Sequence, residues 1–254
     1  KFVTFICRIR YKENLFMKPF FIIMFIVICS SVFAQQTIIN DKNAEVRSVI
    51  TFSGIKVSGG IDVFLSQADS YSLAVSADEE KYRDNIKTEV KNGVLVISYG
   101  NDHFGWSSGD KKLRAYVSFK SLESLEASGA CDLSIAGTLN ANSMLIKLSG
   151  ASDIKGPVKI TDLTLNLSGA STVKINGSAE NLNITASGAS DVKNYDFVIE
   201  NCVAKLSGAS DVRITVRNSI SGSASGASTL HYEGNPERKD VATSGASSIS
   251  QKKN

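Results

Sequence analysis

Apolar residues recur at every second position in short runs through most of the chain, and these runs repeat about every 19 residues. Alternation with a period of two is typical of β-strands that bury one face. Three successive runs show it: Met144, Ile146 and Leu148; Leu163, Leu165 and Leu167; Leu182, Ile184 and Ala186. The pattern predicts an all-β protein made of many short, similar strands.

A Ser-Gly-Ala triplet marks each repeat and fixes its frame. The triplet begins at seven serines, spaced 18 to 21 residues apart: Ser128, Ser149, Ser168, Ser187, Ser207, Ser225 and Ser244. Apolar positions alternate before four of these serines, and a further apolar residue stands five positions after every one of the seven. Each repeat is therefore predicted to be a strand, a Ser-Gly-Ala corner, a second strand and a loop. Glycine or asparagine marks that loop in four repeats: Gly137, Gly156, Gly177 and Asn194.

A repeat of this length cannot bury its apolar face alone, so the repeats must stack on one another. We expect a right-handed β-helix-like solenoid with coils of about 19 residues, spaced by about 4.8 Å. Glycine lets each corner turn tightly. Leucine-rich repeats share the period, and Leu122 and Leu125 resemble their start, but Ala130 and Ala151 stand where their asparagines belong.

The region before the triplets is less regular and is expected to form an N-terminal β-rich cap at residues 35–120. Ser58-Gly59-Gly60 has apolar positions on both sides and is interpreted as a degenerate first coil. Asn92-Gly93 predicts a hairpin turn. Further elements are expected near residues 72–77 (strand), 78–86 (short helix) and 113–119 (strand). Because uncapped coils leave exposed edges, we expect this region to cover one end of the solenoid. The seven triplet coils then occupy residues 121–250.

The N-terminal residues 1–34 have the layout of a leader. Translation is predicted to start at Met17, after which Lys18 precedes an apolar run at residues 20–28. Small residues follow, up to a predicted cut before Gln35, which is the arrangement of a secretory signal peptide. At the other end, residues 251–254 form a polar tail that is expected to fray.

Two alternatives to a cleaved leader were weighed. An uncleaved anchor would need roughly 20 apolar residues to cross a bilayer, and the run is shorter. Lipid attachment at Cys29 would need a small residue before the cysteine, where Ile28 stands.

Charge and cysteine positions narrow the class of protein. Residues 1–34 hold five basic residues and one acidic residue, so residues 35–254 carry 23 basic and 24 acidic side chains. This balance gives no basis for nucleic-acid binding, and no later apolar run is long enough to cross a membrane.

Cys131 and Cys202 lie four coils apart, about 19 Å by strand spacing. A disulfide needs Cα atoms within roughly 7 Å, so both thiols are predicted to be free.

Aspartates recur four residues after the triplet serine and are the weak candidates for a metal site. They are Asp132, Asp153, Asp191 and Asp211, and stacking would place them in two neighbouring pairs. Such pairs repel unless a cation or hydrogen-bond donors lie between them. The alternative, favoured by threonine or serine at the same position elsewhere, is that each side chain caps its own turn. No metal or other cofactor is therefore expected.

The loop at residues 100–112 contains the weak candidates for ligand contact, His103, Phe104 and Trp106. An exposed aromatic ring can stack on a sugar or anchor a protein partner; the alternative is packing against the solenoid end. The chain has only two histidines, and no general acid–base pair or nucleophile arrangement can be named. The sequence thus predicts no catalytic residues and no enzyme.

Several motifs together resemble the head GIN domain family, which is labelled an auto-transporter adhesin and is common in Bacteroidota. They are Phe52-x-Gly54-Ile55-x-Val57-x-Gly59, Lys91-Asn92-Gly93-Val94-Leu95-x-Ile97, the serial Ser-Gly-Ala corners and Tyr232-x-Gly234-x-Pro236. The resemblance extends from Val46 to Ser250. It implies a single β-helix-like domain at a secreted or surface location, and it implies no catalytic site.

These observations favour an exported, adhesin-like binding module of the cell envelope that lacks catalytic activity. Its partner would be a glycan or an envelope protein, and its location the periplasm, the outer-membrane surface or the exterior. Two other classes stay open: a periplasmic envelope-stress or scaffold component, and a carbohydrate-active β-helix enzyme.

Overall fold

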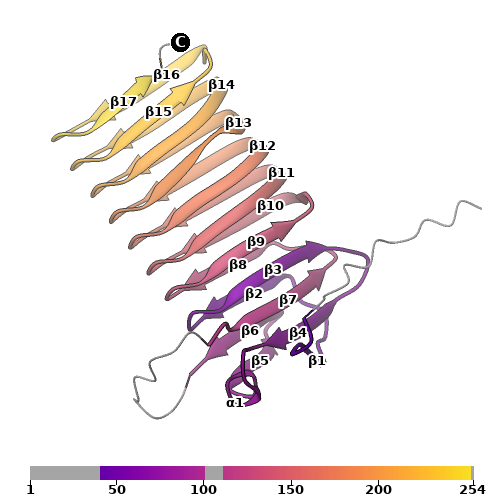
Figure 1. Cartoon of the computed structure of the whole chain (residues 1–254). Helices are drawn as coiled ribbons and strands as arrows, with labels where there is room; N and C mark the ends of the chain where they lie inside the picture. The colour runs from indigo at the N-terminus through magenta and orange to yellow at the C-terminus, as the bar shows by residue number, and fades with distance from the viewer. Residues whose placement is uncertain (1–40, 101–110, 253–254) are drawn as a thin grey trace, which may run out of the picture. The chain divides into compact units, whose positions relative to one another are not determined.

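The computed structural model describes residues 41–100 and 111–252, which lie in one compact unit. The predicted leader, the candidate start at Met17 and most of the 100–112 loop fall outside these residues. Within the described part, all seventeen strands join in one hydrogen-bonded sheet, accompanied by one short helix (Figure 1). No helix in this part is long or apolar enough to cross a membrane.

The predicted β-solenoid with coils of about 19 residues is confirmed. From residue 124 onward each strand pairs in parallel with its counterparts in the coils before and after it (Figure 1). Asp153, for example, lies opposite Thr172, which in turn lies opposite Asp191. The strands are β8 (Ser124–Ser128), β9 (Asp132–Ala136), β10 (Leu139–Leu148), β11 (Asp153–Leu167), β12 (Thr172–Ala186), β13 (Asp191–Leu206), β14 (Asp211–Ala224), β15 (Thr229–Glu233), β16 (Arg238–Thr243) and β17 (Ser248–Gln251).

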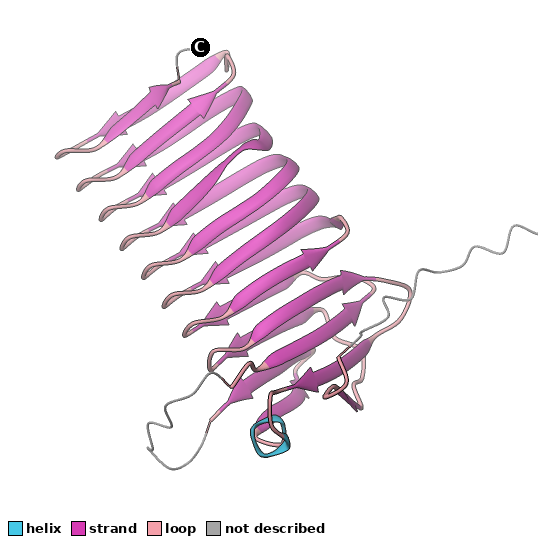
Figure 2. Cartoon of the chain, viewed as in Figure 1, coloured by secondary structure: helices cyan, strands magenta, loops and turns pink. Residues whose placement is uncertain are grey.

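The Ser-Gly-Ala corners stack as a backbone ladder along one side of the coils (Figure 2). The amide of Ala170 donates to the carbonyl oxygen of Gly150 at 2.7 Å, and the same bond recurs from coil to coil. Gly169 has φ +72°, a conformation that L side chains rarely adopt. A Cβ atom there would lie 2.4 Å from the carbonyl oxygen of Gly150. Glycine is thus required both by the turn and by the close approach of the next coil.

A column of buried serines closes the corners from inside. Each stands three residues after the triplet serine and donates its hydroxyl to that serine's carbonyl oxygen, as Ser171 does to Ser168 at 2.9 Å. The column is Ser152, Ser171, Ser190, Ser210 and Ser228, all at most 1% exposed. Cys131 holds the same position in the first triplet, where its thiol lies 3.3 Å from the carbonyl oxygen of Ser128. These bonds satisfy hydroxyls that would otherwise be buried at a cost.

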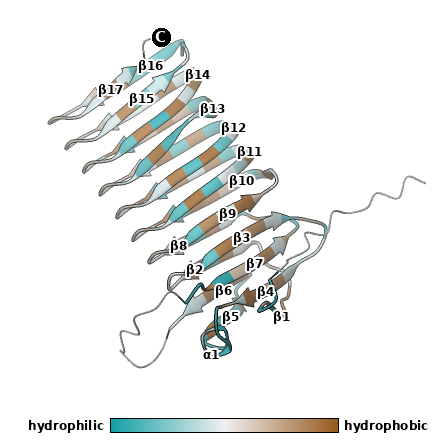
Figure 3. Ribbon diagram, in the orientation of Figure 1, coloured by the Kyte–Doolittle hydropathy of each residue, from teal (hydrophilic) through white to brown (hydrophobic). Residues whose placement is uncertain are grey.

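Apolar and polar residues alternate along the strands (Figure 3), and the apolar ones are buried at the positions that the sequence indicated. Ile154, Val173 and Val192, five residues after their serines, are at most 1% exposed. Cys202 occupies a core position opposite Leu182. Both cysteines are free and buried, as predicted.

The predicted loop after the second strand is absent from the middle coils. β11, β12 and β13 instead run through it as continuous strands of 15 or 16 residues that bend (Figure 2). Gly156 and Gly177 lie inside strands, at φ +133° and +106°. A Cβ at Gly177 would overlap the backbone carbonyl of Val158 in the preceding coil. These glycines lie at bends where neighbouring backbones remain paired. The prediction that they lie in loops between strands is therefore wrong for these coils.

The order of the first coils in space also differs from their order in sequence. β2 (Gly54–Ser58) and β3 (Asp62–Gln67) form a coil around Gly59, as the degenerate triplet indicated. That coil is not terminal, because it lies between β8 and β9 on one side and β6 (Val94–Tyr99) and β7 (Arg114–Phe119) on the other. The chain therefore returns to add a further parallel layer beneath its first coil.

Antiparallel strands cover that layer and form the predicted cap. β5 (Ile86–Lys91) pairs with β6 through the Asn92-Gly93 turn, where both residues have positive φ. β4 (Ser72–Ser76) pairs antiparallel with β7, and β1 (Glu45–Arg47) with β4. The expected short helix is α1 (Glu80–Arg83). A parallel coil ends here because its edge is taken by strands of opposite direction.

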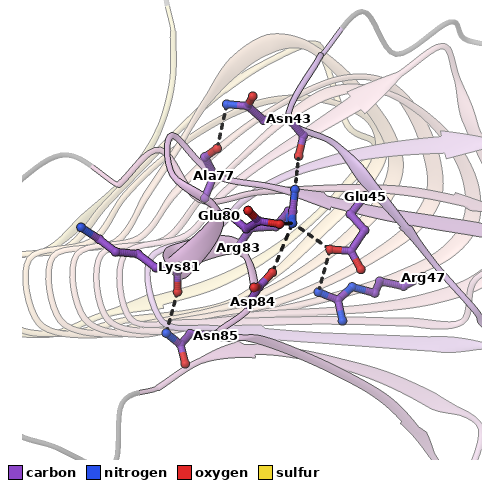
Figure 4. Close-up of polar contacts among 9 residues, drawn as sticks. All are labelled: Asn43, Glu45, Arg47, Ala77, Glu80, Lys81, Arg83, Asp84 and Asn85. Atoms are coloured by element: carbon purple, nitrogen blue, oxygen red, sulfur yellow. Dashed lines mark hydrogen bonds and ion pairs between the residues drawn. The ribbon is translucent and has the colours of Figure 1, made fainter.

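Arg83 fastens the outermost strand to the helix (Figure 4). Its Nε lies 2.9 Å from a carboxylate oxygen of Glu45 on β1, and its guanidinium also pairs with Glu80 and Asp84. The amide of Asn43 donates to the carbonyl oxygen of Ala77 at 3.1 Å. These polar contacts hold the segment before β1 against the end of β4.

Asp41 adds a second fastening on β7. Its carboxylate accepts bonds from the hydroxyl of Tyr116 at 2.9 Å and the backbone amide of Asn43 at 3.0 Å, and it pairs with Arg114. Burial alone would raise the pKa of Asp41, but these donors and the arginine charge hold it below its ordinary value. The aspartate therefore stays ionised in the folded cap.

The opposite end of the stack carries β16 and β17. Instead of fraying at residue 251, β17 extends through Gln251, whose side-chain amide donates to the carbonyl oxygen of Gly234. Lys252 pairs with Glu233 at 2.7 Å. Every residue of β16 is exposed, so charged side chains line the edge of this last coil.

Candidate functional site

An open groove of about 920 Å³ runs across successive coils. It lies where the long strands bend, roughly midway between one corner and the next. Lys159 and Thr161 on β11, Ser178 and Glu180 on β12, and Glu200 on β13 contribute to its lining. The lining extends over neighbouring strands from β10 to β14, so a single groove crosses several coils.

A ladder of amide side chains follows the far side of this bend. Asn181 donates its side-chain amide to Asp162 at 2.8 Å, and Asn201 donates to the side-chain oxygen of Asn181 at 3.0 Å. Asn218 and Ser219 both donate to Asn201 at 2.8 Å. Asp162, Asn181 and Asn201 stand opposite one another in register. The ladder thus joins four successive coils, from β11 to β14, beside the groove.

The rim of the groove carries polar side chains, and its base is formed by apolar ones. Ile160 and Ala179 are buried beneath it, whereas Lys159 and Ser178 are exposed. Glu200 pairs with Arg217 at 3.5 Å across neighbouring coils. Hydroxyl, amide, ammonium and carboxylate groups thus face the same open channel. This arrangement can exchange many hydrogen bonds with a polar chain.

Two carboxylates from neighbouring strands line the groove, and the sequence pattern did not indicate them. Glu180 on β12 and Glu200 on β13 lie between residue pairs that are in register, Ala179 with Ile199 and Asn181 with Asn201. The two glutamates are one repeat apart, but the repeat length changes from 19 to 20 residues at this point, so the sequence did not indicate that they form a pair.

The amide ladder, in contrast, did have a signal in the sequence. A small polar residue stands six positions before the triplet serine in these coils.

The aspartate candidates stand on the face that follows each corner. Asp132 lies opposite Asp153, and Asp191 opposite Asp211, as expected from stacking. Two of the four form ion pairs: Asp191 pairs with Lys193, and Asp211 with Arg213 at 2.7 Å. The described residues contain no group of three or more His, Cys, Asp or Glu side chains placed to hold a metal ion.

The hydrogen bonds of these aspartates reach the next coil. Asp153 accepts the backbone amide of Thr172 at 3.1 Å, and Asp211 accepts the hydroxyl of Thr229 at 3.1 Å. The corner itself is closed by the buried serine one position earlier, such as Ser152. Asp153 and Asp211 therefore connect neighbouring coils.

The other candidates contribute no described chemistry. His103, Phe104 and Trp106 lie outside the described residues. Burial raises the pKa of the Cys202 thiol to about 12, so this cysteine is a core hydrophobe in the folded protein. His231 lies beside Ser250, at 2.9 Å from its hydroxyl.

The fold and the corner motif agree with a family comparison. Residues 51–236 match the family described as "Putative auto-transporter adhesin, head GIN domain", and the chain belongs to this family. The match spans more than half of the chain and includes most of the cap, six of the seven corners and the groove. A comparison with curated proteins finds no match.

Crystal structures of several Bacteroidales proteins share the fold. A putative adhesin from Bacteroides fragilis has a TM-score of 0.73 and 20% identity, covering 83% of this chain and 98% of its own. A putative adhesin from Parabacteroides merdae has a TM-score of 0.63 and 16% identity, covering 83% and 95%. A putative lipid binding protein from Parabacteroides distasonis has a TM-score of 0.62 and 21% identity, covering 84% and 98%. At these identities the likeness concerns the fold alone.

Proposed function

We propose that this protein is an exported binding module of the cell envelope that holds a polar, extended ligand along the groove. A glycan chain fits the chemistry best. The single observation that carries the proposal is the open groove of about 920 Å³ with its alternating hydroxyl, amide and charged groups. Family membership supports an adhesin-like role at the cell surface or beyond it.

The geometry suits a linear ligand better than a compact one. Equivalent positions recur at the spacing of neighbouring strands, about 4.8 Å, so similar groups are offered at regular intervals. Many bridging hydrogen bonds over a polar surface give specificity with modest affinity per contact. A chain of sugars offers donors and acceptors on a comparable repeat.

The test fills the groove without breaking the fold. Ser178 is exposed in the groove, and replacing it as Ser178→Tyr places a ring in the channel. The matched control is Ser223→Tyr, an exposed serine on β14 that lies outside the groove. The full chain and both variants would be applied to a glycan microarray, with melting temperatures measured in parallel.

We expect S178Y to abolish or greatly weaken the wild-type glycan signals, and S223Y to retain them, at equal melting temperatures. Equal glycan binding by S178Y and wild type would contradict the groove assignment. Absence of any wild-type glycan signal would turn the proposal toward a protein partner or scaffold. Protease shaving of intact cells then separates a surface module from a periplasmic one, because only the surface module is cleaved.

A second function, hydrolysis of a carbohydrate, is favoured by one observation, the Glu180 and Glu200 pair in the groove. Glycosidases use two carboxyl groups on either side of the bond that they cleave. Here both glutamates project from neighbouring parallel strands, and Glu200 is paired with Arg217. Release of reducing ends by wild-type protein, lost in Glu180→Gln, would establish this function in place of simple binding.

A further inference from the structure

One outward column on the face after the corners is basic in five consecutive coils. The column stands six residues after each triplet serine and comprises Lys155, Lys174, Lys193, Arg213 and His231. Register pairs join Lys155 with Lys174, Lys193 with Arg213, and Arg213 with His231. Lys155, Lys174 and Arg213 are exposed. The column lies apart from the groove, none of whose lining residues belong to it.

Folding alone gives no reason for this column. Like charges directly opposite on neighbouring strands destabilise a sheet. Lys193 and Arg213 are compensated by Asp191 and Asp211 on their own strands. Lys155 and Lys174 take part in none of the ion pairs found among the described residues. The column is therefore least compensated at its Lys155 end.

An exposed aromatic pair continues the same column beyond that end. Lys155 stands opposite Ser134, Ser134 opposite Phe64, and Phe64 opposite Tyr116. The Phe64 and Tyr116 rings are stacked, with centroids 5.1 Å apart and planes inclined by 17°. Phe64 is 39% exposed, and the bond from Tyr116 to Asp41 steadies its ring.

Along this column, one small residue, Ser134, stands between the aromatic ring of Phe64 and the ammonium group of Lys155. Tyr116 covers one face of Phe64, so the other face looks along the column toward Ser134. Serine is small, and Lys155 follows one strand further on. Two strand spacings separate Phe64 from Lys155, roughly 10 Å. A sugar ring over Ser134 would stack on Phe64 and present its substituents to Lys155 and Lys174.

We propose that Phe64, Ser134, Lys155 and Lys174 form a binding site for an acidic glycan, a chain of sugars that carry carboxylates. The aromatic face takes the apolar side of one sugar. The two ammonium groups take the carboxylates of that sugar and its neighbour through charge-assisted hydrogen bonds. This second site goes beyond the groove and does not depend on it.

Asp132 and Asp153 set the direction of the ligand. They stand on the neighbouring outward column, two residues before Ser134 and Lys155, and lie opposite each other. Their negative charges disfavour an anion over their own column. The ligand must therefore follow the basic column along the stack.

Trigalacturonate, a short linear polyuronate, is the probe for this site, with maltotriose as the neutral trisaccharide. Binding to the full chain would be measured by isothermal titration calorimetry at low salt. The site variants are Lys155→Gln and Phe64→Leu, and the matched charge control is Lys205→Gln, an exposed lysine on the face before the corners. We expect K155Q and F64L each to weaken trigalacturonate binding about tenfold, and K205Q to leave it unchanged. Maltotriose should bind wild type at least tenfold more weakly at this site.

Asp153→Asn provides the opposite change and should strengthen trigalacturonate binding severalfold by removing a nearby negative charge. Inorganic polyphosphate is the probe for charge alone. If polyphosphate binds more tightly than trigalacturonate and F64L leaves both affinities unchanged, the column acts as an ion exchanger and the proposal is wrong. Equal weakening by K155Q and K205Q, or no measurable trigalacturonate binding to wild type, would also overturn it. The groove variant S178Y should bind trigalacturonate normally, so the two sites fail separately.

Discussion

The cap and the coils of this protein are held together in different ways. In the coils, the same backbone contact recurs at six successive corners, as in the bond from Ala170 to Gly150, and apolar side chains fill the same interior columns. In the cap, each contact occurs once. Arg83 reaches Glu45, and Asp41 reaches Tyr116, through side chains that have no counterpart elsewhere.

The coils are held by interactions that repeat, whereas the cap is held by interactions that end the stack. A repeating unit needs only nearest-neighbour complementarity, so each coil stabilises the next. An end must cover an edge once and stop further pairing. The antiparallel strands β4 and β5 do so by running against the direction of β7 and β6. Substitutions in the coils should therefore act on the whole stack, and those in the cap locally.

The largest effect is expected at a corner glycine. In Gly169→Ala the new Cβ would lie 2.4 Å from the carbonyl oxygen of Gly150, at φ +72°. The backbone must move in two coils, and we expect a loss of more than about 3 kcal/mol of unfolding free energy. Gly93→Ala is the matched control, because it has φ +76° but nothing within 4 Å of a Cβ. It should lose only roughly 1–2 kcal/mol, the cost of the conformation. Urea denaturation measures both, and equal losses would argue against close stacking at the corners.

A smaller effect is expected at the buried serine column. Ser171→Ala removes a hydroxyl that donates to Ser168 and leaves that carbonyl oxygen without this donor. We expect a loss of about 1–2 kcal/mol. Cys131→Ser introduces the residue type of the other coils and should change the free energy of unfolding by less than about 0.5 kcal/mol. If S171A proved neutral in urea denaturation, the column would be a packing feature with no role for its hydrogen bonds.

Much of the coil could be predicted from sequence because its information is local and repeated. The interval between triplets gave the period, and apolar alternation gave residues such as Ile154 and Val173 their buried positions. The bends at Gly156 and Gly177 were read as loops, since a glycine looks the same in a break and in a strand pressed against its neighbour.

The cap and the sites depended on contacts between distant segments. Nothing local places β6 beneath β2, or brings Asp41 to Tyr116. To predict the groove, one would have to know where each coil bends, and that position varies with repeat length. The aromatic and basic column needed the register between Phe64 and Ser134, residues that lie in separate parts of the chain.

The smallest effect is expected from acid at the cap. Because the folded pKa of Asp41 lies below its ordinary value, its contribution to stability is present above about pH 4. That contribution is lost as pH falls through the lowered pKa, when the carboxylate is protonated. The difference in melting temperature between wild type and Asp41→Asn should therefore be largest near neutral pH and shrink toward pH 2. A difference that stays constant over this range would show that the charge of Asp41 is unimportant.

The corners form hydrogen-bonded architecture that joins the coils, and they are not free binding loops. Hydrogen–deuterium exchange of the full chain tests this most directly. The amides of Ala151, Ala170 and Ala189, which donate to glycine carbonyls in the preceding coil, should exchange as slowly as the flanking strands. The amides of α1 in the cap should exchange faster. Corner amides that exchange as rapidly as exposed loops would contradict the account.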